Sequence, residues 1–200
     1  MEYISKFLEA MIFAGELEPE LKIGQEQLAH LEKYYNEQSK NKEIKVIINK
    51  ELSRYANNYI KNAPFGLANQ CHNICQSFFD LCTRNGVTEI CGMAITIGNV
   101  RYKGKKLYKT TPESIKETIR KGFQPEEQLD LHVWLTLVDM SVLDLTIIPT
   151  LISKNKATPK DFKGKELVVW RKSNDHYLEY IPMLHDDNFL HKVDKLAFRV

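Results

Sequence analysis

The order of helical and extended patterns along the chain constrains its fold more than any other feature. Apolar residues recur at helical spacing in four early segments, which are residues 1–15, 24–39, 43–60 and 70–84. A strand over 87–98 and a helix over 111–123 follow, and four predicted strands end the chain. Helices followed by strands predict an α+β fold in which helices pack on an antiparallel sheet.

Local signals set the boundaries of these elements. The isoleucines of 44–48 continue a helical stripe, so one long helix is favoured over a strand there. Asn62, Pro64 and Gly66 end that helix. The helix at 111–123 begins with Thr111 as N-cap and Pro112 at its first position. The last four strands are predicted to form two hairpins: 131–138 with 141–148, and 166–172 with 176–183, the second turned at 173–175.

Length and charge narrow the class of protein. The chain suits a single domain over 1–200, with a helical N-terminal region at 1–62 and an α+β core at 63–200. A net charge of +2 argues against a nucleic-acid partner. The longest apolar runs fall short of the roughly 20 residues that cross a bilayer, and no secretion signal is recognised at the start. We therefore expect a cytoplasmic protein without a membrane partner, whose four cysteines are reduced thiols.

Three of the four cysteines stand in one predicted helix, within the segment NQCHNICQSFFDLC at 69–82. Cys75 and Cys82 are interpreted as small core residues, because burial beside phenylalanines makes a thiol inert. Cys71 differs because it lies at the start of the helix. There the N–H groups of the first turn and the positive end of the helix dipole stabilise a thiolate, and they can also hold an oxyanion. Cys71 is therefore the candidate nucleophile.

The same segment allows a metal-binding interpretation. Cys71, His72 and Cys75 could supply three zinc ligands. On a helix, however, His72 points about 100° away from Cys71, and the remaining cysteines form no second compact pair. A zinc site at these residues stays an alternative, while the favoured interpretation involves no metal ion and no cofactor.

A thiolate nucleophile needs a base, and the base needs a group that orients it. His132 begins an otherwise apolar predicted strand, and Asp144 lies between two leucines of the next one. Either residue alone is explained by hydrogen bonds to nearby backbone in the core. Together on one hairpin, an imidazole and a carboxylate can form a pair that leaves one ring nitrogen for the thiol.

Strand geometry provides a condition for this pairing. A two-residue turn at 139–140 would put His132 and Asp144 on opposite faces of the hairpin. The pair therefore requires a three-residue loop or a bulge, and we predict one. Asp139, the competing carboxylate, is interpreted as a turn residue.

Three short motifs resemble the papain-like and transglutaminase-like cysteine enzymes. They are Gln70-Cys71-His72, His132-Val133-Trp134 and the segment 142–146, VLDLT. The resemblance implies a papain-like core in which Cys71 is the nucleophile, His132 the general base and acid, and Asp144 the orienting group.

The resemblance is incomplete at the oxyanion hole. Papain-type enzymes place a glutamine several residues before the cysteine, and this chain has Phe65 at the sixth position back. Asn69 or Gln70 could substitute, together with the backbone N–H of Cys71. Helix capping is the favoured role for Asn69. Trp134 shares the strand face of His132, where it either walls the site or belongs to the core.

These observations favour an enzyme, a cysteine hydrolase or acyltransferase that acts on an amide bond. Its substrate would be a protein, a peptide or a small amide. Peptidase, amidase and deamidase activities are not separated by the sequence. The alternatives are a non-catalytic binding module on the same fold and the zinc protein described above.

Overall fold

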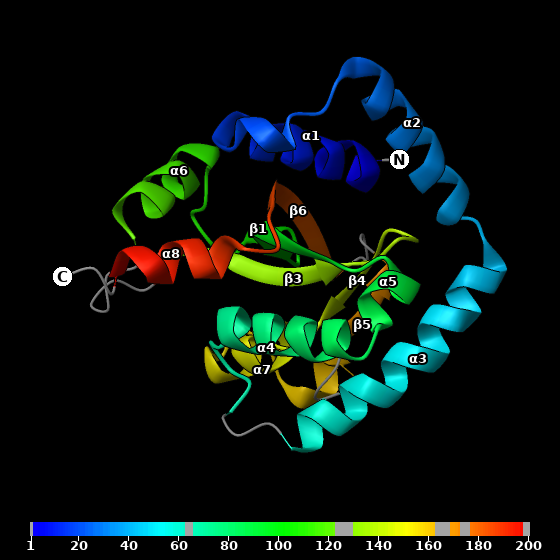
Figure 1. Cartoon of the computed structure of the whole chain (residues 1–200). Helices are drawn as coiled ribbons and strands as arrows, with labels where there is room; N and C mark the ends of the chain where they lie inside the picture. The colour runs from blue at the N-terminus through cyan, green and yellow to red at the C-terminus, as the bar shows by residue number, and fades with distance from the viewer. Residues whose placement is uncertain (1, 63–65, 123–129, 163–168, 173–176, 198–200) are drawn as a thin grey trace. The chain divides into compact units, whose positions relative to one another are not determined.

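The computed structural model describes residues 2–62, 66–122, 130–162, 169–172 and 177–197, and it confirms the α+β class (Figure 1). The backbone groups into two compact units that interleave along the sequence. The first unit comprises Met1–Asn36, Thr96–His132 and Ser173–Val200, and the second comprises Glu37–Ile95 and Val133–Lys172. The single-domain organisation stays a prediction.

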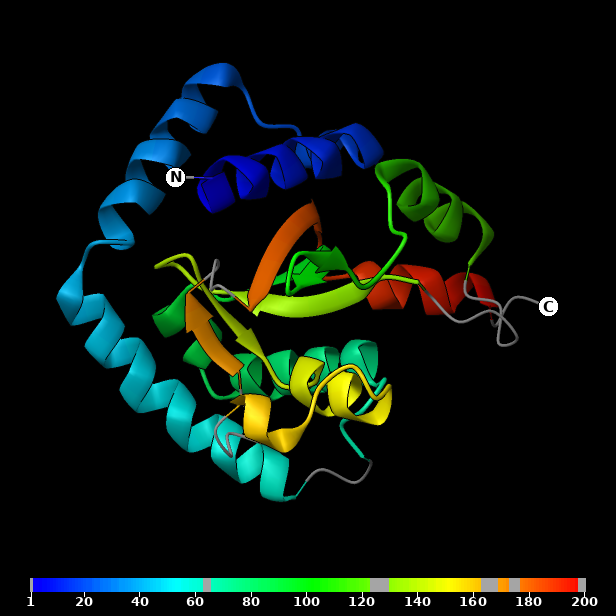
Figure 2. The same ribbon diagram turned by 180° about the vertical axis from the view of Figure 1, so that it is seen from behind.

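In the first unit, helix α1 (Glu2–Leu17) packs along strand β6 (Leu178–His185), as Figures 1 and 2 show from opposite sides. The apolar face of α1 includes Phe7, which meets the ring of His185 edge-on at 5.5 Å. Strand β6 pairs antiparallel with β1 (Ala94–Tyr102), with a bulge between Ile97 and Gly98. Burial of this apolar face against the strand explains why the predicted first helix forms.

The rest of the first unit is built from short elements and helices. A tight turn at Lys103 and Gly104, both with positive φ, joins β1 to the two-residue strand β2 (Lys105–Lys106). Helix α6 (Pro112–Lys121) begins with the predicted Thr111 cap, which forms a capping box with Ser114. It packs against α8 (Phe189–Ala197). Helix α2 (Gln25–Gln38) and the 3-10 helix η1 (Pro19–Leu21) follow α1.

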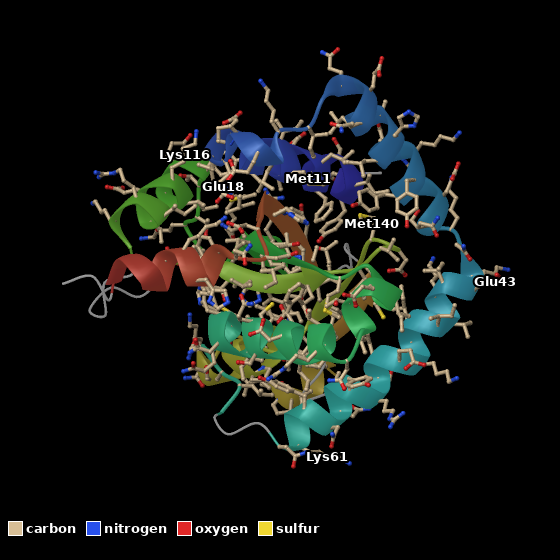
Figure 3. The ribbon with its side chains drawn as sticks, in the orientation of Figure 1. Met11, Glu18, Glu43, Lys61, Lys116 and Met140 are labelled. Carbon is tan, nitrogen blue, oxygen red and sulfur yellow. The ribbon has the colours of Figure 1, made fainter. Side chains whose placement is uncertain are left out.

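The second unit places three helices beside a group of antiparallel strands. Helices α3 (Lys42–Lys61) and α4 (Cys71–Arg84) both pack against the short helix α5 (Val87–Cys91). Strand β4 (Ser141–Asp144) pairs with β3 (His132–Thr136) on one side and with β5 (Val169–Lys172) on the other. Helix α7 (Ile147–Ser153) and the 3-10 helix η2 (Pro159–Phe162) follow β4. Figure 3 labels Glu43 and Lys61 near the two ends of α3, and Met140 in the β3–β4 loop.

The predicted strand over 87–98 is wrong in its first half, where α5 forms instead. Gly86 and Gly92, both in the left-handed region at φ 69° and 52°, delimit this one-turn helix. A Cβ atom on Gly92 would lie 2.6 Å from Cβ of Val138, so the close approach also requires glycine. The two glycines therefore allow a helical turn to form despite the β-branched residues of the segment, and the strand begins only at Ala94.

The second predicted hairpin is also wrong. Strand β5 pairs with β4, and β6 pairs with β1. The turn proposed at 173–175 lies outside the described residues. Ile147 and Ile148, expected in a strand, begin α7, and the alternative strand at 44–48 is wrong because α3 is continuous there. In the described part of the chain, no helix combines the length and the apolar character that crossing a membrane requires.

Candidate functional site

Cys71 is the first residue of α4, as the sequence predicted. The first i to i−4 hydrogen bond at this end joins Ile74 N–H to the carbonyl of Gln70 at 2.9 Å. Residues 71–73 therefore form the first turn of α4, where the helix dipole favours negative charge. Cys71 itself is 7% exposed, while Cys82 at the other end of α4 is fully buried.

The thiol of Cys71 lies beside the imidazole of the next residue, His72. Its Sγ is 3.5 Å from Nδ1 of His72, although helical geometry predicted that His72 points away. His72 is partly buried, and its Nε2 is a buried atom without a hydrogen-bond partner among the described residues. Spacing gave the direction of the Cα–Cβ bonds only, and the rotamers of two neighbouring side chains bring the ring to the sulfur.

Asn69 and Gln70 shape the turn before α4. Gln70 occupies the N-cap position, and Asn69 is left-handed at φ 59°, so the capping role predicted for Asn69 is wrong. The backbone N–H of Asn69 donates to Oγ1 of Thr150 at 2.9 Å, which ties the turn to α7. The Gln70 side-chain oxygen accepts from the Asn73 amide at 3.0 Å. The oxyanion role suggested for Asn69 or Gln70 stays a prediction.

His132 is completely buried at the start of β3. Its Nδ1 lies 3.2 Å from the Tyr108 hydroxyl, and the two rings stack with centroids 5.3 Å apart. Tyr108 is held in turn by the buried side chain of Asn99, whose Oδ1 accepts from the Tyr108 N–H and whose Nδ2 donates to the Tyr108 carbonyl. Sequence reasoning missed this contact of Tyr108 with His132, because the pairing of positions 99, 108 and 132 is entirely tertiary.

Asp144 is buried at the end of β4, where it organises the start of α7. Its Oδ1 accepts from the N–H of Thr146 at 2.9 Å, from the hydroxyl of Thr146 at 3.1 Å and from the N–H of Ile147 at 3.0 Å. The predicted bond to a neighbouring N–H is therefore confirmed. One carboxylate oxygen thus has a structural function that is independent of any catalytic role.

The β3–β4 hairpin has the three-residue loop that the parity condition requires. Leu135 pairs with Leu143 and Thr136 with Val142, and the N–H of Leu137 donates to the carbonyl of Ser141. Residues 138–140 thus form the loop, with Met140 left-handed at φ 60°. Asp139 serves the turn, because its Oδ1 accepts from the backbone N–H and the hydroxyl of Ser141. Both predictions about this hairpin are confirmed.

The other three cysteines are core residues. Cys75 is buried, and with Ile74 and Trp134 it lines a small internal space between α4 and the β3–β4 strands. Trp134 is among the largest fully buried side chains, as expected for a core tryptophan. Burial raises the pKa of Cys82 to about 12 and the pKa of Cys91 to about 11. These thiols are protonated at neutral pH.

The described residues contain no preformed cluster of metal-binding side chains. Cys71, His72 and Cys75 are all described, and no group of three or more His, Cys, Asp or Glu side chains in the described ranges is arranged to hold a metal ion. Sequence spacing alone suggested the zinc alternative.

The structure thus brings Cys71 to His72, His132 to Tyr108, and Asp144 to the first residues of α7. Cys71 and Asp144 belong to the second unit and His132 to the first, so the triad stays a prediction. No family model, no curated protein and no solved structure matches the chain. The papain-like resemblance accordingly rests on the three motifs alone.

Proposed function

We propose that this protein is a cysteine-dependent acyl-transfer enzyme that acts on an amide bond. Cys71 is the nucleophile, His132 the general base and acid, and Asp144 the orienting group. The observation that carries the proposal is the position of Cys71, whose Sγ lies in the first turn of α4 within 3.5 Å of an imidazole nitrogen. A thiol at a helix N-terminus beside an imidazole is the arrangement that forms a reactive thiolate.

The chemistry follows from these groups. The Cys71 thiolate attacks the amide carbonyl carbon, and the backbone N–H groups of the first turn of α4 stabilise the resulting oxyanion. The C–N bond breaks when the imidazolium of His132 gives its proton to the leaving amine. Water or a second amine then attacks the thioester, which returns the thiol and releases the acyl product.

The contact between Tyr108 and His132 supports the role of His132 as a base. If Nδ1 donates its hydrogen to the Tyr108 oxygen at 3.2 Å, Nε2 is the unprotonated nitrogen that can accept a proton from a thiol. Tyr108 thereby fixes the tautomer, a task usually given to a carboxylate. Asp144 and Tyr108 are thus two candidates for the orienting group.

We further propose a protein, a peptide or a small amide as substrate and the reducing cytoplasm as location. The four cysteines form no disulfide in the described residues, which agrees with a reducing compartment. In the proposed reaction, the protein's own contribution comes from its side chains and backbone groups alone.

A non-catalytic binding module on the same fold is the second candidate. It is favoured by the structural use of Asp144, whose Oδ1 accepts three hydrogen bonds at the start of α7. In that case the buried ionisable residues stabilise the fold, and a surface of the protein binds a partner without chemistry.

The experiment uses p-nitrophenyl acetate as a generic acyl donor. Wild-type protein is expected to release p-nitrophenolate and to carry an acetyl group on Cys71, detected by mass spectrometry of peptides. Cys71→Ser should lose both signals, whereas Cys75→Ala, the matched control on the same helix, should keep them. Release that is equal in wild type and Cys71→Ser would reject the enzyme and favour the binding module.

A further inference from the structure

We infer that His72 is a second functional imidazole of the site, which donates Nδ1–H to the Cys71 thiolate and holds that sulfur ready for attack. The inference deepens the proposed function, because it takes Cys71 as the nucleophile. It assigns to His72 a positioning role on the sulfur that is separate from the proton transfer proposed for His132.

The distance gives the first argument. Sγ of Cys71 and Nδ1 of His72 are 3.5 Å apart, which is within the range of an N–H to sulfur hydrogen bond. Both residues lie in the first turn of a 14-residue helix, so the contact is built on a regular element and not on a loop. A hydrogen bond to a charged acceptor is about twice as strong as a neutral one.

The surroundings of the second ring nitrogen give the direction of that bond. Nε2 of His72 is buried and has no hydrogen-bond partner among the described residues. A buried N–H without an acceptor destabilises the fold, and such donors are rare in proteins. The neutral ring with its hydrogen on Nδ1 leaves no N–H without an acceptor, and that hydrogen points at the sulfur.

The helix end gives the third argument. The positive end of the helix dipole in the first turn stabilises negative charge on Sγ, and the His72 donor adds a side-chain hydrogen bond to the same atom. The sulfur therefore has two independent sources of stabilisation as a thiolate. Only one of them is lost when His72 is replaced.

The test measures the rate of Cys71 alkylation by iodoacetamide against pH in the full chain, with peptide mass spectrometry to identify the site. His72→Leu should slow the reaction at neutral pH about tenfold and move the midpoint of the profile upward, because a charge-assisted hydrogen bond is lost. His72→Asn should stay within about threefold of wild type, since its amide places a donor near the position of Nδ1. Equal profiles for wild type and His72→Leu would overturn the inference.

A measurement on the wild-type protein covers the case in which a variant does not fold. Two-bond ¹H–¹⁵N correlation spectra report which nitrogen of each histidine carries the hydrogen. His72 should show the Nδ1–H tautomer at neutral pH, and the Nε2–H tautomer would overturn the inference.

Failure of this inference and failure of the proposed function give different results. If His72→Leu alters alkylation but wild-type protein does not turn over p-nitrophenyl acetate, the His72–Cys71 bond stands and the enzyme proposal fails. If turnover depends on Cys71 while His72→Leu leaves the alkylation profile unchanged, the enzyme stands and the role of His72 is rejected.

Discussion

The two ends of α4 place the same side chain in opposite chemical surroundings. Cys71 lies in the first turn, at the positive end of the helix dipole, with its Sγ 3.5 Å from Nδ1 of His72. Cys82 lies in the last turns, fully buried, with its pKa raised to about 12 by burial first and by Cys91 second. The same helix therefore holds one cysteine at its dipolar N-terminus and one whose burial disfavours the thiolate, so the reactivity of a cysteine depends on its surroundings and not on residue type alone.

The largest effect that this comparison predicts is a difference in alkylation rate. In native protein at neutral pH, Cys71 should react with iodoacetamide at least about a thousandfold faster than Cys82 or Cys91, because their thiolate fractions and access are both far lower. Peptide mass spectrometry after timed quenching measures the rates. In denaturant the four rates should converge, and similar native rates for Cys71 and Cys82 would break the comparison.

The next largest effect concerns Asp144, which stabilises the start of α7 and is also a candidate for the group that orients His132. Asp144→Ala removes three hydrogen bonds at the start of α7 and should lower the free energy of unfolding by about 2–3 kcal/mol, as measured by urea denaturation. Asp144→Asn keeps an acceptor oxygen and should cost about 1 kcal/mol or less. If Asp144→Asn also keeps full turnover of p-nitrophenyl acetate, the negative charge of Asp144 is not needed to orient His132.

Tyr108→Phe tests the second candidate for the group that orients His132. The substitution removes the hydroxyl 3.2 Å from Nδ1 of His132 while keeping the stacked ring. It should lower stability by about 1 kcal/mol. If Tyr108 orients His132, the pH profile of turnover should shift as well, whereas unchanged turnover with the same loss of stability would give Tyr108 a structural role only.

The smallest effect is the pH dependence of stability caused by Cys82. Its pKa is raised in the folded state to about 12, so its contribution is complete below the thiol pKa of the unfolded chain and is lost as pH rises toward the folded value. Above the unfolded value, stability should fall by about 1.4 kcal/mol per pH unit from this group. Urea denaturation at several alkaline pH values should show a shallower slope for Cys82→Ala than for wild type.

The helices were predictable because their signal is local. The stripe of α3, the Pro-Gly break after it and the Thr111 cap of α6 each depend on residues a few positions apart. The hairpin of β3 with β4 was predictable for the same reason, but the pairing of the other strands was not. The sequence placed 166–172 beside 176–183, but β5 pairs with β4 and β6 with β1, because partners of a strand are chosen by tertiary packing. Helix α8 was not predicted, although Asp186 stands just before it and its side chain accepts a hydrogen bond from the N–H of Asn188.

The candidate site was likewise predictable where the signal is local and not where it depends on tertiary contacts. The position of Cys71 at the start of α4 was predictable because a helix start can be located from its neighbours, and the three-residue hairpin loop was predicted from strand parity. The contact of His72 with the sulfur depends on rotamers, and the contact of Tyr108 with His132 depends on how distant segments meet. Neither is encoded in spacing, so neither could be found before the structure.

The interleaving of the two units has a consequence for how the protein is made. The apolar face of α1 is covered by β6, and these two elements stand at opposite ends of the sequence. During synthesis the helix emerges well before its partner strand, so its apolar face stays exposed while the intervening chain is made. The segments 37–95 and 133–172 are complete before that strand appears. A newly made chain should therefore acquire its second unit first, and it should depend on chaperones for as long as Phe7 and its neighbours await burial.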